Sequence, residues 1–330
     1  MEPTIEGMDE VRALLERGPI RAPLTRVSVL GGGISNRVLL IESGNDRFVF
    51  KQALDRLRVK DEWLADRSRL LREVACLKAI RNFVGPQWAP EVLAEWTESF
   101  ACLMEAAPEG SRTWKDDLLK GTIDPSVTQK VIHLMSALHR TTRGHPEVKQ
   151  IFKDQTNFIQ LRIDPYFITI GQRHPDLKEK IESCITPLFE GFCLVHGDFS
   201  PKNLLLHPDG RLWLLDCEVG HYGNPVFDLS FCANHLLLKS IHLNSRTALQ
   251  EARRLWTGYW SALEGFPRDF LEPIAVKTLA LLLLARVDGK SPVEYLSEQK
   301  RQVVRQLART LIAEQVDRFE ELSDAVSERL

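Results

Sequence analysis

The sequence has little excess charge of either sign, no closely spaced pair of cysteines and no long hydrophobic run. Its 330 residues hold 43 Lys and Arg against 45 Asp and Glu, so no strong field favours nucleic acid or an anionic membrane as a partner. The longest purely apolar run, residues 279–285, is far too short to cross a bilayer, and residues 1–7 lack the apolar region of a signal peptide. We therefore expect a cytoplasmic protein without nucleic acid or membrane partners.

Cysteine usage is consistent with a reducing compartment. The six cysteines are scattered and include no C-x-x-C pair, so we expect reduced thiols in the core rather than a disulfide frame or a zinc site: Cys76, Cys102, Cys184, Cys193, Cys217 and Cys232. With 44% hydrophobic and 27% charged residues the composition is that of a globular protein, long enough for one large or two modest domains.

Hydrophobic periodicity changes character near residue 105. Before it, the pattern predicts a short helix over 5–18, a longer helix over 70–80, and strands over 25–30, 37–42, 47–52, 90–96 and 100–104. After the Pro- and Gly-bearing stretch 105–110 it predicts helices over 126–142, 155–187, 226–242, 245–263, 268–286 and 292–325, with a strand hairpin around 193–217. We expect an α+β fold with a small antiparallel-sheet lobe (1–105), a larger helical lobe (106–330) and a cleft between them.

The hairpin carries the most specific motif. His196, Asp198 and Asn203 form an H-x-D-x-x-x-x-N pattern, and Asp216 follows after a short apolar strand. This layout is typical of phosphoryl transfer, in which one carboxylate acts on the acceptor hydroxyl while an amide and a second carboxylate hold the metal. We predict Asp198 as the catalytic base and Asn203 and Asp216 as metal ligands; the alternative is ordinary capping and turn roles. His196 is predicted to be structural, and Lys202 to contact phosphate or simply to be solvated.

A second set of residues fits the phosphate donor. Lys51 lies in the third strand and can pair with the α- and β-phosphates of ATP and with Glu73 on the following helix; a surface ion pair is the alternative. The glycine-rich turn 31–36 would cover the phosphates, through Gly32, Gly33 and Ser35, unless it is only a turn. By position, the backbone of Met104, Glu105 and Ala106 would meet the adenine, unless the stretch only connects the lobes.

Two stretches near expected helix breaks are candidates for binding the acceptor, and each contains an Arg and an Asp. They are residues 161–166, with Arg162 and Asp164, and residues 285–290, with Arg286 and Asp288. Helix-end capping and salt bridging are the alternative. Glu218 is a candidate contact of the acceptor or of a second metal. Neither stretch is densely acidic, which argues against a polycationic acceptor and for a neutral polyol or sugar.

The chain resembles the aminoglycoside phosphotransferase/choline kinase group, a branch of the protein-kinase-like fold. The resemblance extends from Gly31 to about Phe231 and rests on His196-Gly-Asp198, Asn203, Asp216 and Asp228. It implies ATP, Mg²⁺ and transfer of a phosphoryl group to a hydroxyl of a small molecule. It also implies that Asp228 braces the catalytic loop, where the residues alone suggest a helix cap.

Within that group, two stretches are similar to the methylthioribose kinase branch. One runs from Lys51-Gln-Ala-Leu54 through 57–59 and Glu62-Trp63 to Asp66-Arg67; the other runs from Glu218 through Tyr222-Gly223 to Phe227-Asp228. The chain departs from that branch by having Asn203. The resemblance implies a sugar such as methylthioribose or a related pentose as acceptor.

Other functions stay open at this point. They are an aminoglycoside or choline-type amino-alcohol phosphotransferase, a protein kinase, and a catalytically silent kinase fold that acts as a binding module. A protein kinase is disfavoured because Asp216-Cys-Glu218 stands where D-F-G is expected. A silent fold is disfavoured because Lys51, Glu73, Asp198, Asn203 and Asp216 are all present. The apolar pattern of 292–325 is too short for a sustained coiled coil, so we expect a monomer or a homodimer.

Overall fold

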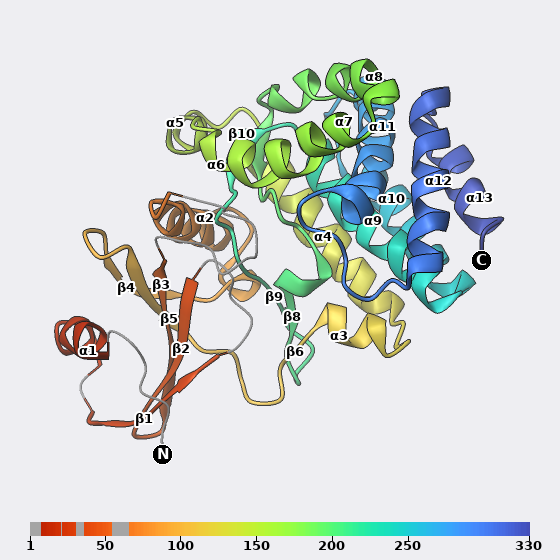
Figure 1. The fold of residues 1–330 in the computed structure, drawn as a ribbon. Helices are drawn as coiled ribbons and strands as arrows, with labels where there is room; N and C mark the ends of the chain where they lie inside the picture. Colours follow the sequence, from red (N-terminus) through yellow and green to blue (C-terminus); the bar gives the residue numbers. More distant parts are fainter. Residues whose placement is uncertain (1–7, 21, 31–35, 55–65) are drawn as a thin grey trace.

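The computed structural model describes residues 8–20, 22–30, 36–54 and 66–330. The phosphate-loop candidates Gly32, Gly33 and Ser35, together with Glu62 and Trp63, lie outside these ranges. In the described part, a sheet with two flanking helices forms one lobe, and a larger mass of helices forms the other (Figure 1). The α+β, bilobal fold predicted from the sequence is confirmed.

The small lobe is built on a five-stranded sheet whose neighbours are all antiparallel, in the order β1-β2-β3-β5-β4. The strands are β1 (Leu24–Val29), β2 (Asn36–Ser43), β3 (Asp46–Ala53), β4 (Val92–Trp96) and β5 (Ala101–Glu105). The two residues Gly44 and Asn45 connect β2 to β3, and Gly44 takes the positive φ of +60° that such a tight hairpin requires. The predicted strands are present, with ends shifted by one or two residues.

Strand alternation sends side chains of β2, β3 and β5 to opposite faces of this sheet. Leu39, Phe50 and Leu103 face α1 (Met8–Glu16) and form a small apolar cluster with its Val11 and Leu15. The intervening positions face the other way, toward α2 (Arg69–Phe83) and the helical lobe, where Cys102 and Met104 join the main core. The lysine next to Phe50 in β3 therefore points toward the helical lobe.

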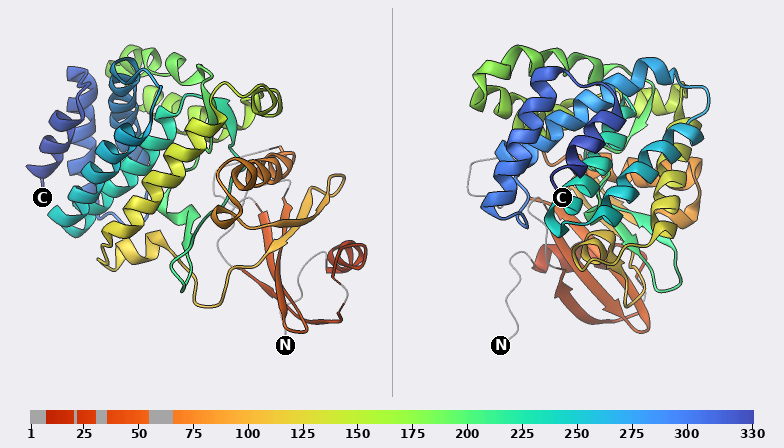
Figure 2. Two further views of the ribbon diagram at one scale, coloured as in Figure 1. Left: turned by 180° about the vertical axis from the view of Figure 1, so that it is seen from behind. Right: turned by 90° about the vertical axis from the view of Figure 1, so that its right-hand side faces the viewer.

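The helical lobe is organised around α9 (Val226–Leu243), which is buried over most of its length. It packs against α10 (Arg246–Ala262) and α11 (Arg268–Asp288), and α10 packs in turn on α4 (Pro125–Thr142). The helices α12 (Glu298–Glu314) and α13 (Phe319–Ser327) lie at the edge farthest from the sheet, in both the front and the back views (Figures 1 and 2). Short helices complete the lobe: α3 (Trp114–Leu119), α5 (Pro146–Phe152), α6 (Thr156–Phe158), α7 (Thr169–Arg173) and α8 (Lys178–Ser183).

Two short sheets interrupt the helices and hold the predicted catalytic segment. The strand β7 (Cys193–Val195) pairs with β10 (His221–Gly223). The hairpin β8 (Leu204–Leu206) and β9 (Leu212–Leu214) is extended by β6 (Arg112–Thr113), the first strand after the large sheet. The loop of residues 196–203 thus runs from the end of one small sheet to the start of the other. We keep 1–105 and 106–330 as the proposed division into domains, with β5 as the last strand of the large sheet.

Two of the predicted helices differ from the structure. The stretch 155–187 is not one helix. Its first part is α6 and a π-helical segment, η2 (Ile159–Ile168). The 3₁₀ turns η3 (Pro175–Leu177) and η4 (Thr186–Phe189) follow further on, with Pro175 as the first residue of η3 and Pro187 as the second residue of η4. The stretch 292–325 becomes helical only at Glu298, because residues 289–297 are irregular. It is then divided into two helices, because Gln315 ends α12 in the left-handed conformation, with φ of +55°. Apolar periodicity alone did not register these interruptions.

Candidate active site

Lys51 lies at the centre of a buried ion-pair cluster. Its Nζ is 2.7 Å from Glu73 Oε2 and 2.8 Å from Asp216 Oδ1, so β3, α2 and the segment after β9 meet at one ammonium group. Glu73 is on the face of α2 that packs under the sheet and is 2% exposed. The predicted contact between Lys51 and Glu73 is therefore present, and Asp216 joins it.

The charged groups of this cluster shift the pKa values of one another. Burial alone would lower the pKa of Lys51, but the carboxylates of Asp216 and Glu73 outweigh it and keep that pKa well above its ordinary value. Burial raises the pKa of Glu73 to about 7, against the opposing pull of Lys51. The pKa of Asp216 is lowered, because the charges of Lys51 and Lys202 exceed the effect of its burial. Lys51 and Asp216 are therefore both charged at neutral pH.

The loop 196–203 is fixed by a carboxylate in the first turn of α9. Asp228 Oδ2 accepts a hydrogen bond from His196 N at 2.8 Å, and Asp228 Oδ1 accepts one from Gly197 N, also at 2.8 Å. On its other side Asp228 meets His139 Nε2 at 3.1 Å, and His139 Nδ1 lies 2.7 Å from Tyr259 Oη. The bracing of the loop by Asp228 is thus visible as two direct hydrogen bonds.

His196 has a structural part in the same loop. Its Nδ1 accepts a hydrogen bond from Asp198 N at 3.1 Å, so the ring proton is on Nε2, which donates to Leu215 O at 3.1 Å. Burial lowers the pKa of His196, which keeps the ring neutral in this arrangement. The histidine therefore connects the loop to Leu215, the residue that follows β9.

Asp198 is 4% exposed and is held by two cations from different elements. Arg162 Nη2, from η2, lies 3.0 Å from Asp198 Oδ2, and Lys202 Nζ lies 2.9 Å from the same oxygen. Burial alone would raise the pKa of Asp198, but the charges of Lys202 and Arg162 outweigh it and lower that pKa. The carboxylate is therefore ionised at neutral pH.

Asn203 and Asp216 lie on adjacent segments. Leu215 N donates to Asn203 O at 2.9 Å, and Asn203 Nδ2 donates to Asp198 O at 2.9 Å. With its nitrogen engaged, the Asn203 amide can offer its oxygen to a cation, and Asp216 offers a carboxylate from a left-handed residue with φ of +65°. Oxygen donors of these two kinds suit Mg²⁺, which takes its remaining ligands from phosphate and water. In the described ranges no three His, Cys, Asp or Glu side chains form a cluster suited to a metal. The site proposed here does not require such a cluster, because it uses one amide and one carboxylate.

One cavity of about 550 Å³ connects these groups. Its walls include most of the residues predicted from the sequence: Lys51, Glu73, Met104, Arg162, Asp198, Asn203, Asp216, Glu218 and Arg286. Glu218 also lies 3.3 Å from the buried Arg69 Nε through its Oε2. Glu105 and Ala106, predicted beside the adenine, are half-buried next to Met104 but are not among the lining side chains.

Asp164 and Asp288, both predicted at the acceptor, lie outside this cavity. Asp164 is exposed, and Asp288 instead bridges Arg305, at 2.7 Å, and His174 Nε2, at 2.9 Å. Each follows a cavity-lining arginine by two positions, and residues two apart in a helix do not share a face. We therefore leave both out of the proposed acceptor site.

Several residues that line the cavity were not predicted from the sequence. Lys115 on α3, His235 and Lys239 on α9, and Glu294 and Tyr295 in the irregular segment 289–297 all line the cavity. Lys239 had a signal in the sequence, since it is a lysine inside the otherwise apolar run of α9, four residues after His235. Lysine is rarely buried without a partner, so a lysine in a helix that is otherwise buried on every side indicates a polar cavity beside that helix.

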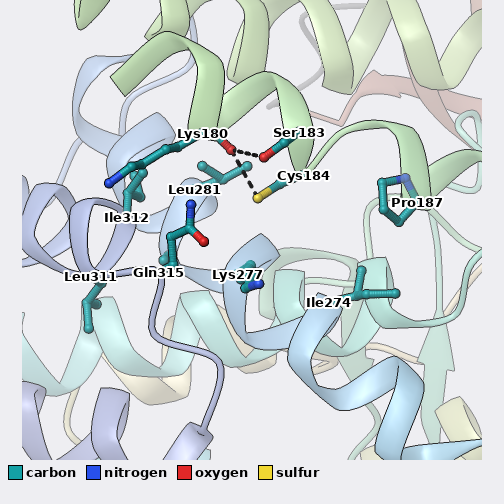
Figure 3. Close-up of a pocket in the computed structure, with 11 residues that line it drawn as sticks. Lys180, Ser183, Cys184, Pro187, Ile274, Lys277, Leu281, Leu311, Ile312 and Gln315 are labelled. Atoms are coloured by element: carbon teal, nitrogen blue, oxygen red, sulfur yellow. Dashed lines mark hydrogen bonds between the residues drawn. The ribbon is translucent and has the colours of Figure 1, made fainter. Parts of the chain in front are cut away.

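A second cavity, of about 140 Å³, lies between α8, α11 and α12 and contains none of the predicted residues (Figure 3). Its walls are mainly apolar, with Lys180 and Lys277 at the edge. All six cysteines are free. Five of them are buried, as expected, but Cys184 is only half-buried and lines this second cavity. In the described ranges, none of the helices combines the length and hydrophobicity needed to span a membrane.

The lysine of the sheet, its carboxylate partner on α2 and the carboxylates of the 196–216 hairpin define a phosphotransferase of the protein-kinase-like class. The sequence profile described as "Phosphotransferase enzyme family" matches residues 26–266, and the chain belongs to that family.

Known proteins are similar over most of the chain. The methylthioribose kinase of Pectobacterium carotovorum subsp. carotovorum (strain PC1) is 28% identical over 281 residues, which are 76% of this chain and 69% of that protein. Among solved structures, the amicoumacin kinase hAmiN, in complex with AMP-PNP, Ca²⁺ and Ami, has a TM-score of 0.59 and 14% identity over 96% of this chain and 100% of that one. The choline kinase LicA from Streptococcus pneumoniae has a TM-score of 0.51 and 16% identity over 93% and 97% of the two chains. These structures share the fold.

Proposed function

We propose that this phosphotransferase transfers the γ-phosphoryl group of Mg·ATP to a hydroxyl group of a small molecule. The observation that carries the proposal is the convergence of Lys51, Glu73 and Asp216 in the same cavity as an ionised, buried Asp198. Separate elements of the chain supply these groups. Along the sequence they occur as a strand lysine, a helix glutamate, a loop aspartate and a second aspartate after a strand, which is the order found in kinase clefts. A further support is the solved relative of the same fold that binds AMP-PNP and Ca²⁺.

Each group has a role in this proposal. Lys51, oriented by Glu73, binds the α- and β-phosphates, the loop with Gly32, Gly33 and Ser35 covers them, and the backbone of residues 104–106 meets the adenine. Asn203 and Asp216 hold Mg²⁺, which when bound neutralises charge on the transferred phosphoryl group. Asp198 orients the acceptor hydroxyl and takes its proton as the oxygen attacks phosphorus. Lys202 lies on the Asp198 carboxylate, from which it can also reach a phosphoryl oxygen.

The acceptor class follows from the size and lining of the cavity. About 550 Å³ has to accommodate both the nucleotide phosphates and the acceptor, which favours a compact molecule over a protein chain. The relatives named methylthioribose kinase support methylthioribose or a related pentose as the first acceptor to test. The matched region spans the whole hairpin 196–216, which holds the proposed catalytic groups.

The test is Mg·ATP consumption by the purified protein with methylthioribose, pentoses, choline, homoserine and aminoglycosides as acceptors. The Asp198→Asn variant is the control. An acceptor that gives turnover with the wild type and not with the variant supports the proposal. Binding of ATP with no turnover of any acceptor favours a silent kinase fold, and phosphorylation of casein or of the protein itself favours a protein kinase.

A further inference from the structure

The part of the cavity wall that the helical lobe supplies contains cations that no carboxylate of the described residues neutralises. Five cations line it from the helical lobe, against four carboxylates: Lys115, Arg162, Lys202, Lys239 and Arg286 against Asp198, Asp216, Glu218 and Glu294. All four carboxylates already have a cationic partner: Asp198 has Arg162 and Lys202, Asp216 has Lys51, Glu218 has Arg69, and Glu294 has Lys115. Two cations, Lys239 and Arg286, are left without a carboxylate partner among the described residues.

Lys239 is the more informative of the two. Its side chain extends from α9 and is 1% exposed. Its Nζ nevertheless donates only a long hydrogen bond among the described residues, of 3.4 Å, to His235 O in its own helix. Burial, together with the charges of Lys115 and Arg286, lowers the pKa of Lys239 to about 7. An ammonium group in such surroundings is costly unless an anion compensates it. Lys239 lines the cavity, so a bound anion can reach it.

Arg286 faces the same space from α11. Its Nη1 donates to Tyr166 Oη at 2.9 Å and to Ser291 Oγ at 3.1 Å, which fixes the guanidinium in place. Its Nε is buried without a hydrogen-bond partner among the described residues, as is the hydroxyl of the neighbouring Tyr295. The site therefore has fixed donors that the described part of the protein does not satisfy.

The aromatic rings of this wall argue against a cationic acceptor. A quaternary ammonium or amino group is usually bound over ring faces. Here the face of Phe231 is taken by Arg162 at 5.4 Å, that of Tyr166 by Arg286 at 5.7 Å, and that of Tyr295 by Lys239 at 5.2 Å. Each of these three rings therefore already has a cation of the protein over it.

A chain of contacts links this wall to the proposed catalytic base. Arg162 touches Asp198, lies 5.7 Å from the centre of the Tyr166 ring, and Tyr166 is bonded to Arg286. We propose that the acceptor is an acidic hydroxy compound, whose carboxylate or phosphate group binds between Lys239 and Arg286 while its hydroxyl lies against Asp198. This inference rests on the proposed function and narrows its acceptor from small hydroxyl compounds in general to those with an anionic group, so it favours an acidic relative of a pentose over methylthioribose itself.

The test measures binding to the complex with saturating AMP-PNP and Mg²⁺, so that the sites for nucleotide phosphates are occupied. The probes are D-ribose 5-phosphate, D-ribonate, D-ribose and choline, titrated by calorimetry. We expect at least one anion to bind roughly 10- to 100-fold more tightly than ribose and choline, which is the effect of one or two charge-assisted hydrogen bonds. The two anions distinguish a phosphate-bearing acceptor from a carboxylate-bearing one.

Two variants and a control assign the effect to this wall. Lys239→Met removes a buried charge and should keep the fold; Arg286→Gln removes the second charge and keeps a hydrogen-bonding group. Each should lose most of the preference for the anion. Lys277→Met, on the same helix as Arg286 but at the other cavity (Figure 3), should keep it.

The outcomes separate the two proposals. Ribose binding as tightly as both anions, or a preference that survives in both variants, would overturn the acidic acceptor and leave the phosphotransferase proposal intact. Failure of AMP-PNP to bind to the wild-type protein would remove both. Binding of an anion that depends on Lys239 and Arg286, with AMP-PNP in place, supports both.

Discussion

Arg162 and Asp198 form a buried ion pair, with 3.0 Å between Arg162 Nη2 and Asp198 Oδ2. The same arginine donates from Nε to Gly197 O at 2.7 Å, so one side chain of η2 holds both the backbone of the loop and its carboxylate. Arg162 was predicted from the sequence as an acceptor contact. Its contacts show that it holds Asp198 in place, and the contact with the acceptor stays a prediction.

Replacing Asp198 by Asn should lower kcat by roughly 10²- to 10⁴-fold, because the variant cannot take the proton of the acceptor hydroxyl. The side chain keeps its shape, so the affinity for ATP should stay close to that of the wild type. Steady-state kinetics with the acceptor found above, together with ATP titration, checks both. Turnover close to that of the wild type would remove Asp198 from the mechanism.

Asp216→Ala should lose the dependence of nucleotide binding on Mg²⁺. The variant removes the proposed metal-binding carboxylate and also the charge that is 2.8 Å from Lys51 Nζ. Titration of the fluorescence of a nucleotide analogue with and without Mg²⁺ measures the effect. A Mg²⁺ requirement that is the same in variant and wild type would contradict the metal assignment.

Asp228→Asn should reduce both stability and kcat without changing the KM for ATP. One of its two carboxylate oxygens becomes an amide nitrogen, which cannot accept the hydrogen bond from His196 N or Gly197 N. A buried donor left without a partner costs about 1–3 kcal/mol. Asp124→Asn is the matched control, because Asp124 caps an exposed helix start and Asn caps equally well. Urea unfolding and steady-state kinetics are the measurements; equal losses in both variants would refute the bracing role.

Gly197→Ala should destabilise the protein more than Gly121→Ala does. Both glycines have a positive φ, +75° and +76°, so both variants lose about 1 kcal/mol to backbone strain. A Cβ on Gly197 would also lie 2.6 Å from Val219 Cγ1 and 2.9 Å from Val219 O, whereas one on Gly121 would meet nothing within 4 Å. Overpacking of this kind adds about 1–3 kcal/mol. Urea unfolding of the two variants gives the difference directly, and equal values would show that the loop moves to accommodate the methyl group.

The kcat/KM for a carboxylate-bearing acceptor should fall as the pH rises through about 7, the pKa of Lys239. Below that pH the ammonium is charged and attracts the anion; above it the amine is neutral, and kcat/KM reports the free enzyme. Lys239→Arg stays charged and should flatten this part of the profile. A wild-type profile that Lys239→Arg leaves unchanged would exclude Lys239 as the group responsible. The groups facing Lys239 are Cys232 and His235 on α9, Lys115 on α3, Arg286 on α11, and Glu294 and Tyr295 in the segment 289–297.

The sequence was most informative where local chemistry determines position. Alternation in β3 predicts that Lys51 and Phe50 face opposite sides, and helical spacing places Glu73 on the buried face of α2, so their contact could be expected. The hairpin 196–216 was predicted by its own motif. The glycine turn with Gly32, Gly33 and Ser35 stays a prediction, since it lies outside the described residues.

What the sequence did not show depends on tertiary packing. Lys239 and Arg286 come together because α9 and α11 pack side by side, and no local pattern states which helices are neighbours. Asp164 and Asp288 were predicted at the acceptor because each lies with an arginine near an expected helix break, yet helix geometry turns them away from the cavity. Arg162 reaches Asp198 from a π-helical segment, whose wider turn does not follow the usual helical period.

The position of Arg286 and of residues 291–295 along the chain has a consequence for how such enzymes diverge. The family match ends at residue 266, yet part of the proposed acceptor wall is contributed by these later residues. The proposed catalytic residues and part of the proposed acceptor wall therefore lie on separate lengths of polypeptide. A descendant of this chain could change residues 286–295, and with them the molecule that it accepts, while keeping the hairpin 196–216 unaltered.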